Sequence, residues 1–217
     1  MKKYKIINTI IFIIIFITNV IYAIDFILND KLERLGNNVI LLFALLIPLI
    51  LERIMKKKIS AYIKTVIYIF LFLSHLLGCV VDLYRKVNWY DNFVHFLSGT
   101  LTVFPAIIFL NRSIKTKKIP KLFKLIYSIG CVLLIAIIWE IVEYIGDVLF
   151  NMDLQYQKET GVEDTMQDII AAYLGGLFII IPYLLESSTG IIHRLIKRIK
   201  ILEPSKNNNK NINRKSK

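Results

Sequence analysis

Three pairs of ionisable residues lie at helical spacing inside or at the edge of apolar segments. They are Asp91 and His95 in NWYDNFVHFLSG, Glu140 and Glu143 in IIWEIVEY, and Asp164 and Asp168 in EDTMQDIIAAYLGG. Residues three or four positions apart share one face of a helix. Ionisable groups in apolar helices usually face the interior of a bundle or a water-filled cavity. The spacing therefore predicts that three helices contribute to one buried acidic cluster with a single histidine.

Such a cluster has chemical consequences, because packed carboxylates repel one another and cannot all stay ionised without compensation. Three arrangements would compensate them. Some acids stay protonated, or Arg85 and Lys86 pair with them, or a metal cation binds among them. Carboxylates with one imidazole suit magnesium, manganese, iron or zinc better than copper. The candidate ligands of a divalent metal ion are Asp91, His95, Glu140, Glu143, Asp164 and Asp168.

Glu140, Glu143 and Asp168 are also candidate catalytic residues. A bound metal would activate a water molecule, and a spare carboxylate would act as the general base. A site near the outer end of the helices would open to the outer leaflet of the membrane. The substrate would then be a lipid or a lipid-linked envelope precursor, with hydrolysis or group transfer at a phosphate or an ester. A non-enzymatic role stays open. The cluster could bind a cation or a cationic compound, move protons or ions, or lock three helices together.

Several acids also have purely structural explanations. Asp91 precedes an apolar run and could cap a helix. The stretch TMQD resembles a capping box with Thr165 as N-cap, in which Asp168 would take part. Asp147 fits an interfacial residue at the end of its segment, and Asp164 fits a loop residue. For these residues both interpretations remain open at the level of sequence.

Glu140 and Glu143 lie inside an apolar segment, next to Trp139 and Tyr144, which fit aromatic residues at the outer interface. Their structural alternative is a pair of glutamates whose stems lie along the apolar surface while the heads reach water. For His95 the alternative is a packing residue. The chain contains no P-loop, GxSxG, HExxH or dinucleotide-binding fingerprint.

The elements that must position these residues are apolar helices. The chain of 217 residues is 56% hydrophobic with a mean hydropathy of +0.59. Apolar runs of about 18 residues or more predict membrane-spanning helices. Six such runs are expected at 8–28, 38–55, 60–81, 92–111, 122–146 and 167–186. We therefore expect an all-α, polytopic membrane bundle over residues 1–192, embedded in a lipid bilayer.

The net charge of +12 reflects membrane topology and not nucleic-acid binding. If six helices alternate from a cytoplasmic N-terminus, 23 of the 28 basic residues fall on the cytoplasmic side. The other five are Lys31, Arg34, Arg85, Lys86 and Lys158. The positive-inside rule then places both termini in the cytoplasm. Thirteen of the 16 acids, including all three pairs, fall in or near the outer half.

Three further features complete the prediction. The first apolar run follows MKKYK and resembles a signal peptide, but its length favours an uncleaved anchor. Residues 193–217 are basic and polar, and predict a disordered cytoplasmic tail that could touch anionic lipid. Cys79 and Cys131 lie in different predicted helices, so a disulfide is not expected.

The order of the three motifs resembles the YjdF-like family of bacterial polytopic membrane proteins, which has no established activity. The likeness rests on D-x-x-x-H, E-x-x-E, and D-T-x-x-D followed by Gly-Gly, over residues 88–180. A more distant resemblance is to VanZ-like proteins, whose second motif typically ends in Gln where this chain has Glu143. Their third motif usually has Asn where this chain has Asp168. The resemblance to VanZ-like proteins implies, by analogy, a role in the cell envelope, such as support of envelope integrity or resistance.

Overall fold

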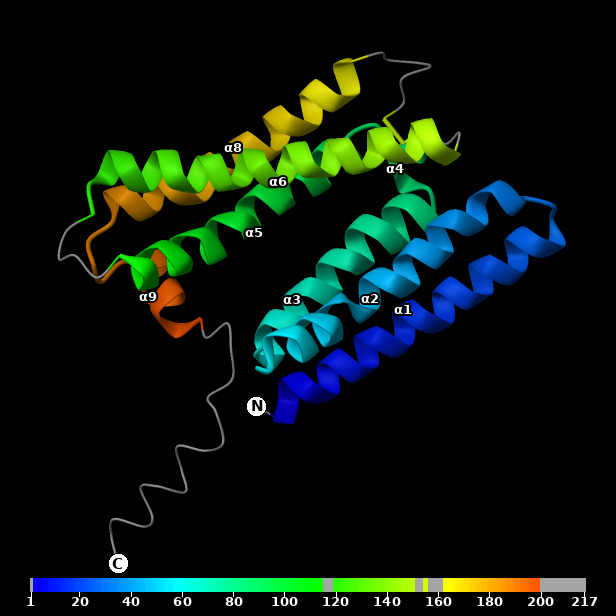
Figure 1. Cartoon of the computed structure of the whole chain (residues 1–217), viewed down its shortest axis with the longest axis horizontal. Coiled ribbons are helices and arrows are strands. Elements are labelled where there is room, and N and C mark those ends of the chain that lie inside the picture. The colour runs from blue at the N-terminus through cyan, green and yellow to red at the C-terminus, as the bar shows by residue number, and fades with distance from the viewer. Residues whose placement is uncertain (1, 115–118, 151–153, 156–161, 200–217) are drawn as a thin grey trace, which may run out of the picture. The chain divides into compact units, whose positions relative to one another are not determined.

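The computed structural model describes residues 2–114, 119–150, 154–155 and 162–199. Its elements in chain order are α1 (Lys2–Leu28), η1 (Leu32–Arg34), α2 (Leu35–Met55), α3 (Ala61–Leu71), η2 (Phe72–Val80), α4 (Leu83–Lys86), α5 (Tyr90–Ser113), α6 (Lys121–Phe150), α8 (Glu163–Leu185) and α9 (Ile191–Arg198). Within these described residues the secondary structure is helical, with no strand. The helices are shown in Figure 1.

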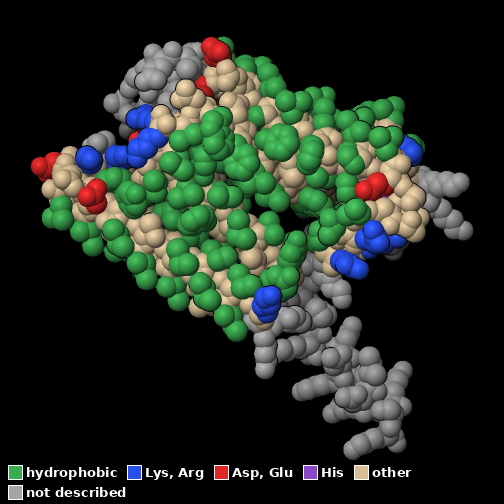
Figure 2. Space-filling view, turned by 180° about the vertical axis from the view of Figure 1, so that it is seen from behind, with side chains coloured by type: hydrophobic (Ala, Val, Ile, Leu, Met, Phe, Trp, Pro, Cys, Tyr) green, Lys and Arg blue, Asp and Glu red, His purple; other side chains and the backbone are tan. Residues whose placement is uncertain are grey.

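Six of these helical segments are long and apolar enough to cross a membrane. They match the six predicted runs, and the prediction of an all-α polytopic membrane bundle is confirmed. Five of the six spans begin earlier than expected, and the largest differences are at Lys2 for α1, Glu163 for α8 and Leu35 for α2. The earlier start of α8 puts Asp164 on the helix and not in a loop. Figure 2 shows that hydrophobic side chains cover most of the visible face, with charged side chains at its margins.

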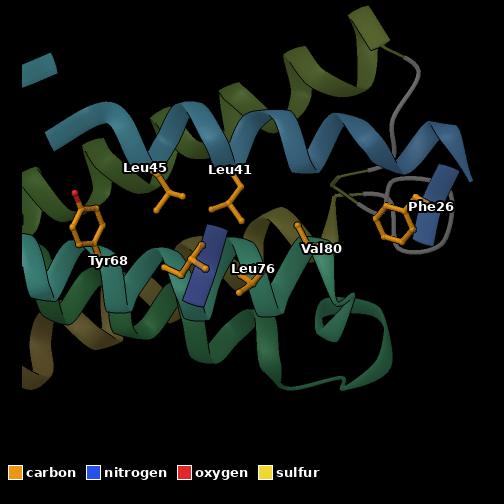
Figure 3. Close-up of a cluster of buried hydrophobic side chains, with 7 residues drawn as sticks. Phe26, Leu41, Leu45, Tyr68, Leu76 and Val80 are labelled. Carbon is orange, nitrogen blue, oxygen red and sulfur yellow. The ribbon is translucent and has the colours of Figure 1, made fainter. Parts of the chain in front are cut away.

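The described helices divide into two compact units, residues 1–86 and residues 87–199. In the first unit, α1, α2, α3 and η2 enclose a cluster of buried apolar side chains. The cluster, shown in Figure 3, contains Ile15, Phe26, Leu41, Leu45, Tyr68, Leu76 and Val80. The third span changes from α-helix to π-helix at Phe72, and π-helical turns are rare and frequently found at functional sites.

Buried polar contacts join the helices of the first unit. Asn19 and Asn38 are almost completely buried, and the Nδ2 group of each donates to the backbone carbonyl of the other. Near one end of the unit, Arg34 pairs with Asp82 at 3.4 Å. His75, in η2, lies with Nε2 3.1 Å from the carbonyl oxygen of Asn37. Polar side chains in apolar helices are stabilising when they find such partners across helices.

The second unit is built from α5, α6 and α8, which lie side by side in Figure 1, with α9 following α8. Its tightest contact is between α5 and α8, which run in the same direction. A Cβ atom on Gly99 would overlap the carbonyl oxygen of Ala172, and one on Gly175 would overlap that of Phe96. Small residues allow helix backbones to approach closely in membranes. Gly176, the next residue, faces Ile129 and Val132 of the antiparallel α6.

The short helix α9 occupies the first residues of the predicted tail, while residues 200–217 lie outside the described part. Both carboxylate oxygens of Glu186 accept from the backbone N–H of Ile192, at 3.0 and 3.4 Å, which satisfies a free donor at the start of α9. The His193 ring stacks on Tyr183 with centroids 4.2 Å apart. These contacts attach α9 to the end of α8.

Candidate functional site

The close crossing of α5 and α8 positions the centre of the candidate site. His95 lies one turn before Gly99 on α5, and Asp168 lies one turn before Ala172 on α8. Gly99 contacts Ala172, and the two helices are parallel. His95 and Asp168, which each lie one turn before these residues, are therefore neighbours. Both side chains are buried, with Asp168 1% exposed and His95 5% exposed.

His95 faces two carboxylates. Its Nε2 atom lies 3.4 Å from Oδ1 of Asp91, one turn earlier on α5, and 3.8 Å from Oδ2 of Asp168. One ligand atom from each of the three residues lies within 4.8 Å of the others. Both N···O distances exceed the usual range of about 2.7–3.2 Å for a hydrogen bond. The imidazole therefore points between the carboxylates without a tight bond to either.

The His95–Asp91 distance fits the coordination shell of a divalent metal ion, and the His95–Asp168 distance is slightly wider. Metal–ligand distances of about 2.0–2.2 Å place neighbouring donor atoms roughly 3.0–3.6 Å apart in octahedral or tetrahedral geometry. The Oδ1 atom of Asp168 is buried and has no hydrogen-bond partner among the described residues. Within the same part of the chain, no lysine or arginine forms an ion pair with Asp91, Glu140 or Asp168. A bound cation or a proton would offset their charge.

Glu140 adds a fourth buried polar group, contributed by α6. Its side chain is 5% exposed, and its Oε1 atom has no hydrogen-bond partner in the described chain. Gln155 holds this glutamate in place, because its Nε2 group donates to the Glu140 carbonyl at 3.2 Å and to Oε2 at 3.4 Å. The same amide also donates to Oγ1 of Thr165 on α8, at 3.2 Å.

Asp147 holds the turn that carries Gln155. Its carboxylate accepts from the backbone N–H of Leu154 at 2.6 Å and of Gln155 at 3.1 Å. The interpretation of Asp147 as an ordinary interfacial residue is therefore incomplete, because its carboxylate shapes the loop after α6. This turn brings a loop amide to Glu140, fifteen residues earlier.

Glu143 and Asp164 lie around this centre. Glu143 is half-buried, and its Oε1 accepts from the indole N–H of Trp139 at 2.7 Å. The carboxylates of Asp91, Asp164, Glu140 and Glu143 all act electrostatically on Asp168. These four acids thus lie near Asp168, but only Asp91, His95 and Asp168 form the compact group of ligand atoms.

The capping explanations do not describe these acids. Helix α5 begins at Tyr90 with Trp89 as N-cap, and α8 begins at Glu163 with Val162 as N-cap. Neither N-cap residue makes a side-chain capping hydrogen bond. The predicted capping box at Thr165 is wrong, because α8 already begins at Glu163. The Thr165 hydroxyl instead accepts a hydrogen bond from Gln155. Asp91 sits in the first turn of α5, where the helix dipole favours a carboxylate.

Sequence reasoning missed Gln155. It lies outside every predicted helix, so no helical spacing relates it to Glu140. The sequence signal nearest to it is Asp147, which shares the helix face of Glu140 and binds the turn. Gly99, Gly175 and Gly176, in contrast, carry the small-residue signal that predicts close helix contact.

Comparisons with known proteins place the chain among membrane proteins without an assigned activity. A family described as "Predicted membrane protein (DUF2238)" matches residues 7–186. An uncharacterised protein of Thermotoga maritima is 26% identical over 129 residues, which are 59% of this chain and 65% of the relative. No solved structure matches the chain. These findings name neither the YjdF-like nor the VanZ-like family.

Proposed function

The chain belongs to the DUF2238 family of predicted membrane proteins, and we propose that it is a metal-dependent hydrolase or transferase acting on lipids or lipid-linked envelope precursors. The observation that carries this proposal is the buried group of Asp91, His95 and Asp168. Their ligand atoms lie within 4.8 Å of one another at a close helix crossing that Gly99 and Gly175 allow. Buried ionisable groups in membrane helices are costly and usually functional.

In this proposal Asp91, His95 and Asp168 hold a divalent ion, which when bound supplies an activated water molecule and a positive charge for an anionic substrate. Glu140 is the general base. Its Oε1 atom is buried without a hydrogen-bond partner in the described chain, and Gln155 fixes its other oxygen. A positioned carboxylate of this kind can accept a proton from the attacking water. Glu143 and Asp164 add negative charge and remain candidate ligands or bases.

The proposed substrate is amphiphilic because the surface near the cluster is apolar and aromatic. Trp89 and Phe93 on one side, and Trp139 and Tyr144 on the other, are exposed large side chains. Aromatic residues of this kind sit at the level of lipid head groups. The resemblance to VanZ-like proteins supports an envelope substrate by analogy only, and the predicted topology would open the cluster to the outer leaflet.

Metal content tests the central claim. Wild-type protein purified without chelator should contain about one divalent ion per chain, measured by elemental mass spectrometry. His95→Ala and Asp168→Asn should lose it. Glu186→Gln, which changes an acid at the opposite end of α8, is the matched control and should retain it. A wild-type protein without metal, or His95→Ala and Asp168→Asn variants with full metal content, would contradict the proposal.

Substitutions of Glu140 distinguish a catalytic role of the site from simple cation binding. Glu140→Gln should keep the metal but abolish function in a complementation assay, and Glu140→Asp should fail as well, because position matters to about 1 Å. Function retained in both variants, with metal present, would favour the alternative of a non-enzymatic cation site. In a protein without metal, Asp91, His95 and Asp168 would instead share protons and lock α5 to α8.

A further inference from the structure

The first unit carries a second polar feature, at the turn between α2 and α3 (residues 56–60). Two adjoining open pockets lie there, with volumes of about 540 and 380 Å³. They share the side chains of Leu49, Glu52 and Lys58. The smaller pocket also reaches Lys5, Asn8, Thr9 and Phe12 of α1. The residues of both pockets belong to the first unit, whereas the acidic cluster belongs to the second. The two pockets are called the double pocket below.

The side chains that line this double pocket carry a strong net positive charge. Glu52 is its single acid, and this carboxylate is already satisfied. Its Oε1 atom lies 2.8 Å from Nζ of Lys64 and accepts from the backbone N–H of Ile59 at 2.8 Å. Five other cations line the two pockets, and none of them makes an ion pair among the described residues: Lys5, Arg53, Lys56, Lys57 and Lys58.

The opposite wall of the pocket is apolar. Leu46, Leu49 and Ile50 project from the end of α2, and Phe12 projects from α1. Both helices are long and apolar enough to span the bilayer. An occupant must therefore combine an anionic group, placed among the lysines at the end of the spans, with a chain that lies along apolar helix surface.

We propose that this pocket binds the head group of an anionic phospholipid. The phosphate lies between Lys5 and Lys58, and an acyl chain runs along Leu49 and Phe12 toward the bilayer centre. Basic residues next to membrane spans attract the anionic lipids of the cytoplasmic leaflet. This assignment agrees with the predicted topology, which places the α2–α3 turn on the cytoplasmic side.

Native mass spectrometry of the full chain in detergent, with added phosphatidylglycerol or phosphatidylcholine, tests this site. The wild type should retain phosphatidylglycerol and not phosphatidylcholine. Lys5→Gln combined with Lys58→Gln should weaken phosphatidylglycerol binding roughly 30-fold, because each basic residue near a lipid surface contributes about fivefold. Arg112→Gln combined with Lys121→Gln removes the same charge from the other unit and should leave binding unchanged. Unfolding temperatures of both double variants verify that they are folded.

A substitution of Glu52 should instead raise the affinity of the double pocket for phosphatidylglycerol. Glu52→Gln frees the Lys64 ammonium while leaving an oxygen for Ile59, so phosphatidylglycerol binding should strengthen. Equal retention of both lipids by the wild type, an unaffected Lys5→Gln and Lys58→Gln variant, or an equal loss in the control pair would overturn the proposal. Displacement of the lipid by soluble glycerol phosphate at similar concentration would overturn it as well, and would identify a small-anion site.

Discussion

At the scale of single residues, the candidate site shows how a loop amide can organise buried carboxylates. Gln155 contacts a backbone carbonyl, a carboxylate and a hydroxyl, and so joins α6 to α8 next to the proposed metal ligands. Asp147 holds the backbone on which it sits. Because buried polar groups are costly when unpaired, this small network stabilises the glutamate position.

Replacing Gln155 with Leu should therefore lower stability. The substitution removes the donor to the buried Oε2 atom and carbonyl of Glu140, and the free energy of unfolding should fall by about 1–3 kcal/mol. Denaturant unfolding in detergent measures the change. Gln167→Leu is the matched control, because Gln167 is exposed and both of its hydrogen bonds, to Glu163 and from Asn92, lie at the surface. A loss no larger than that of the control would contradict a positioning role for Gln155.

At the scale of elements, the crossing of α5 and α8 determines whether the site exists. His95 and Asp168 belong to different helices, and their approach depends on how closely these helices pack. Gly99 and Gly175 lie where any side chain would overlap a backbone carbonyl of the other helix. The absence of two Cβ atoms thus places a histidine and an aspartate within 3.8 Å.

Two glycine-to-alanine substitutions compare the effect of an added methyl group at the crossing, at Gly99, with its effect at Gly130, where no neighbouring atom lies within 4 Å. Gly99→Ala should destabilise the protein by about 1–3 kcal/mol, because the added methyl group forces α5 away from Ala172. It should also reduce metal content, since His95 and Asp168 separate. Gly130→Ala adds the same group in α6 where nothing lies within 4 Å, and should stabilise by about 0.5–1 kcal/mol. Equal effects of both changes on unfolding and on metal content would argue against the crossing as the element that positions the site.

At the scale of the whole molecule, the charge distribution predicts orientation in the membrane. Basic residues concentrate near the termini and over residues 53–64 and 112–124, while the acidic pairs lie at the opposite ends of the predicted spans. The positive-inside rule therefore predicts cytoplasmic termini and an acidic cluster toward the outside. This orientation also determines which leaflet each of the two proposed sites would face.

Labelling with a membrane-impermeant maleimide tests the orientation in intact cells. A single cysteine at Asn88, in a variant with Cys79 and Cys131 replaced by Ala, should react from outside. A single cysteine at Lys57 in the same background should react only after the cells are opened. The reverse pattern would contradict the topology, and the two proposed sites would then exchange leaflets.

The sequence by itself determined the class of fold and the helix faces that carry the paired ionisable residues. Apolar run length predicts spans, and spacings such as Asp91 to His95 predict a shared face, because both depend on the geometry of one helix. The sequence did not determine which faces meet. The rotation and approach of α5, α6 and α8 depend on packing between residues far apart in the chain, such as Gly99 and Ala172. Only the tertiary structure therefore selected Asp91, His95 and Asp168 from the six candidates and brought Gln155 to Glu140.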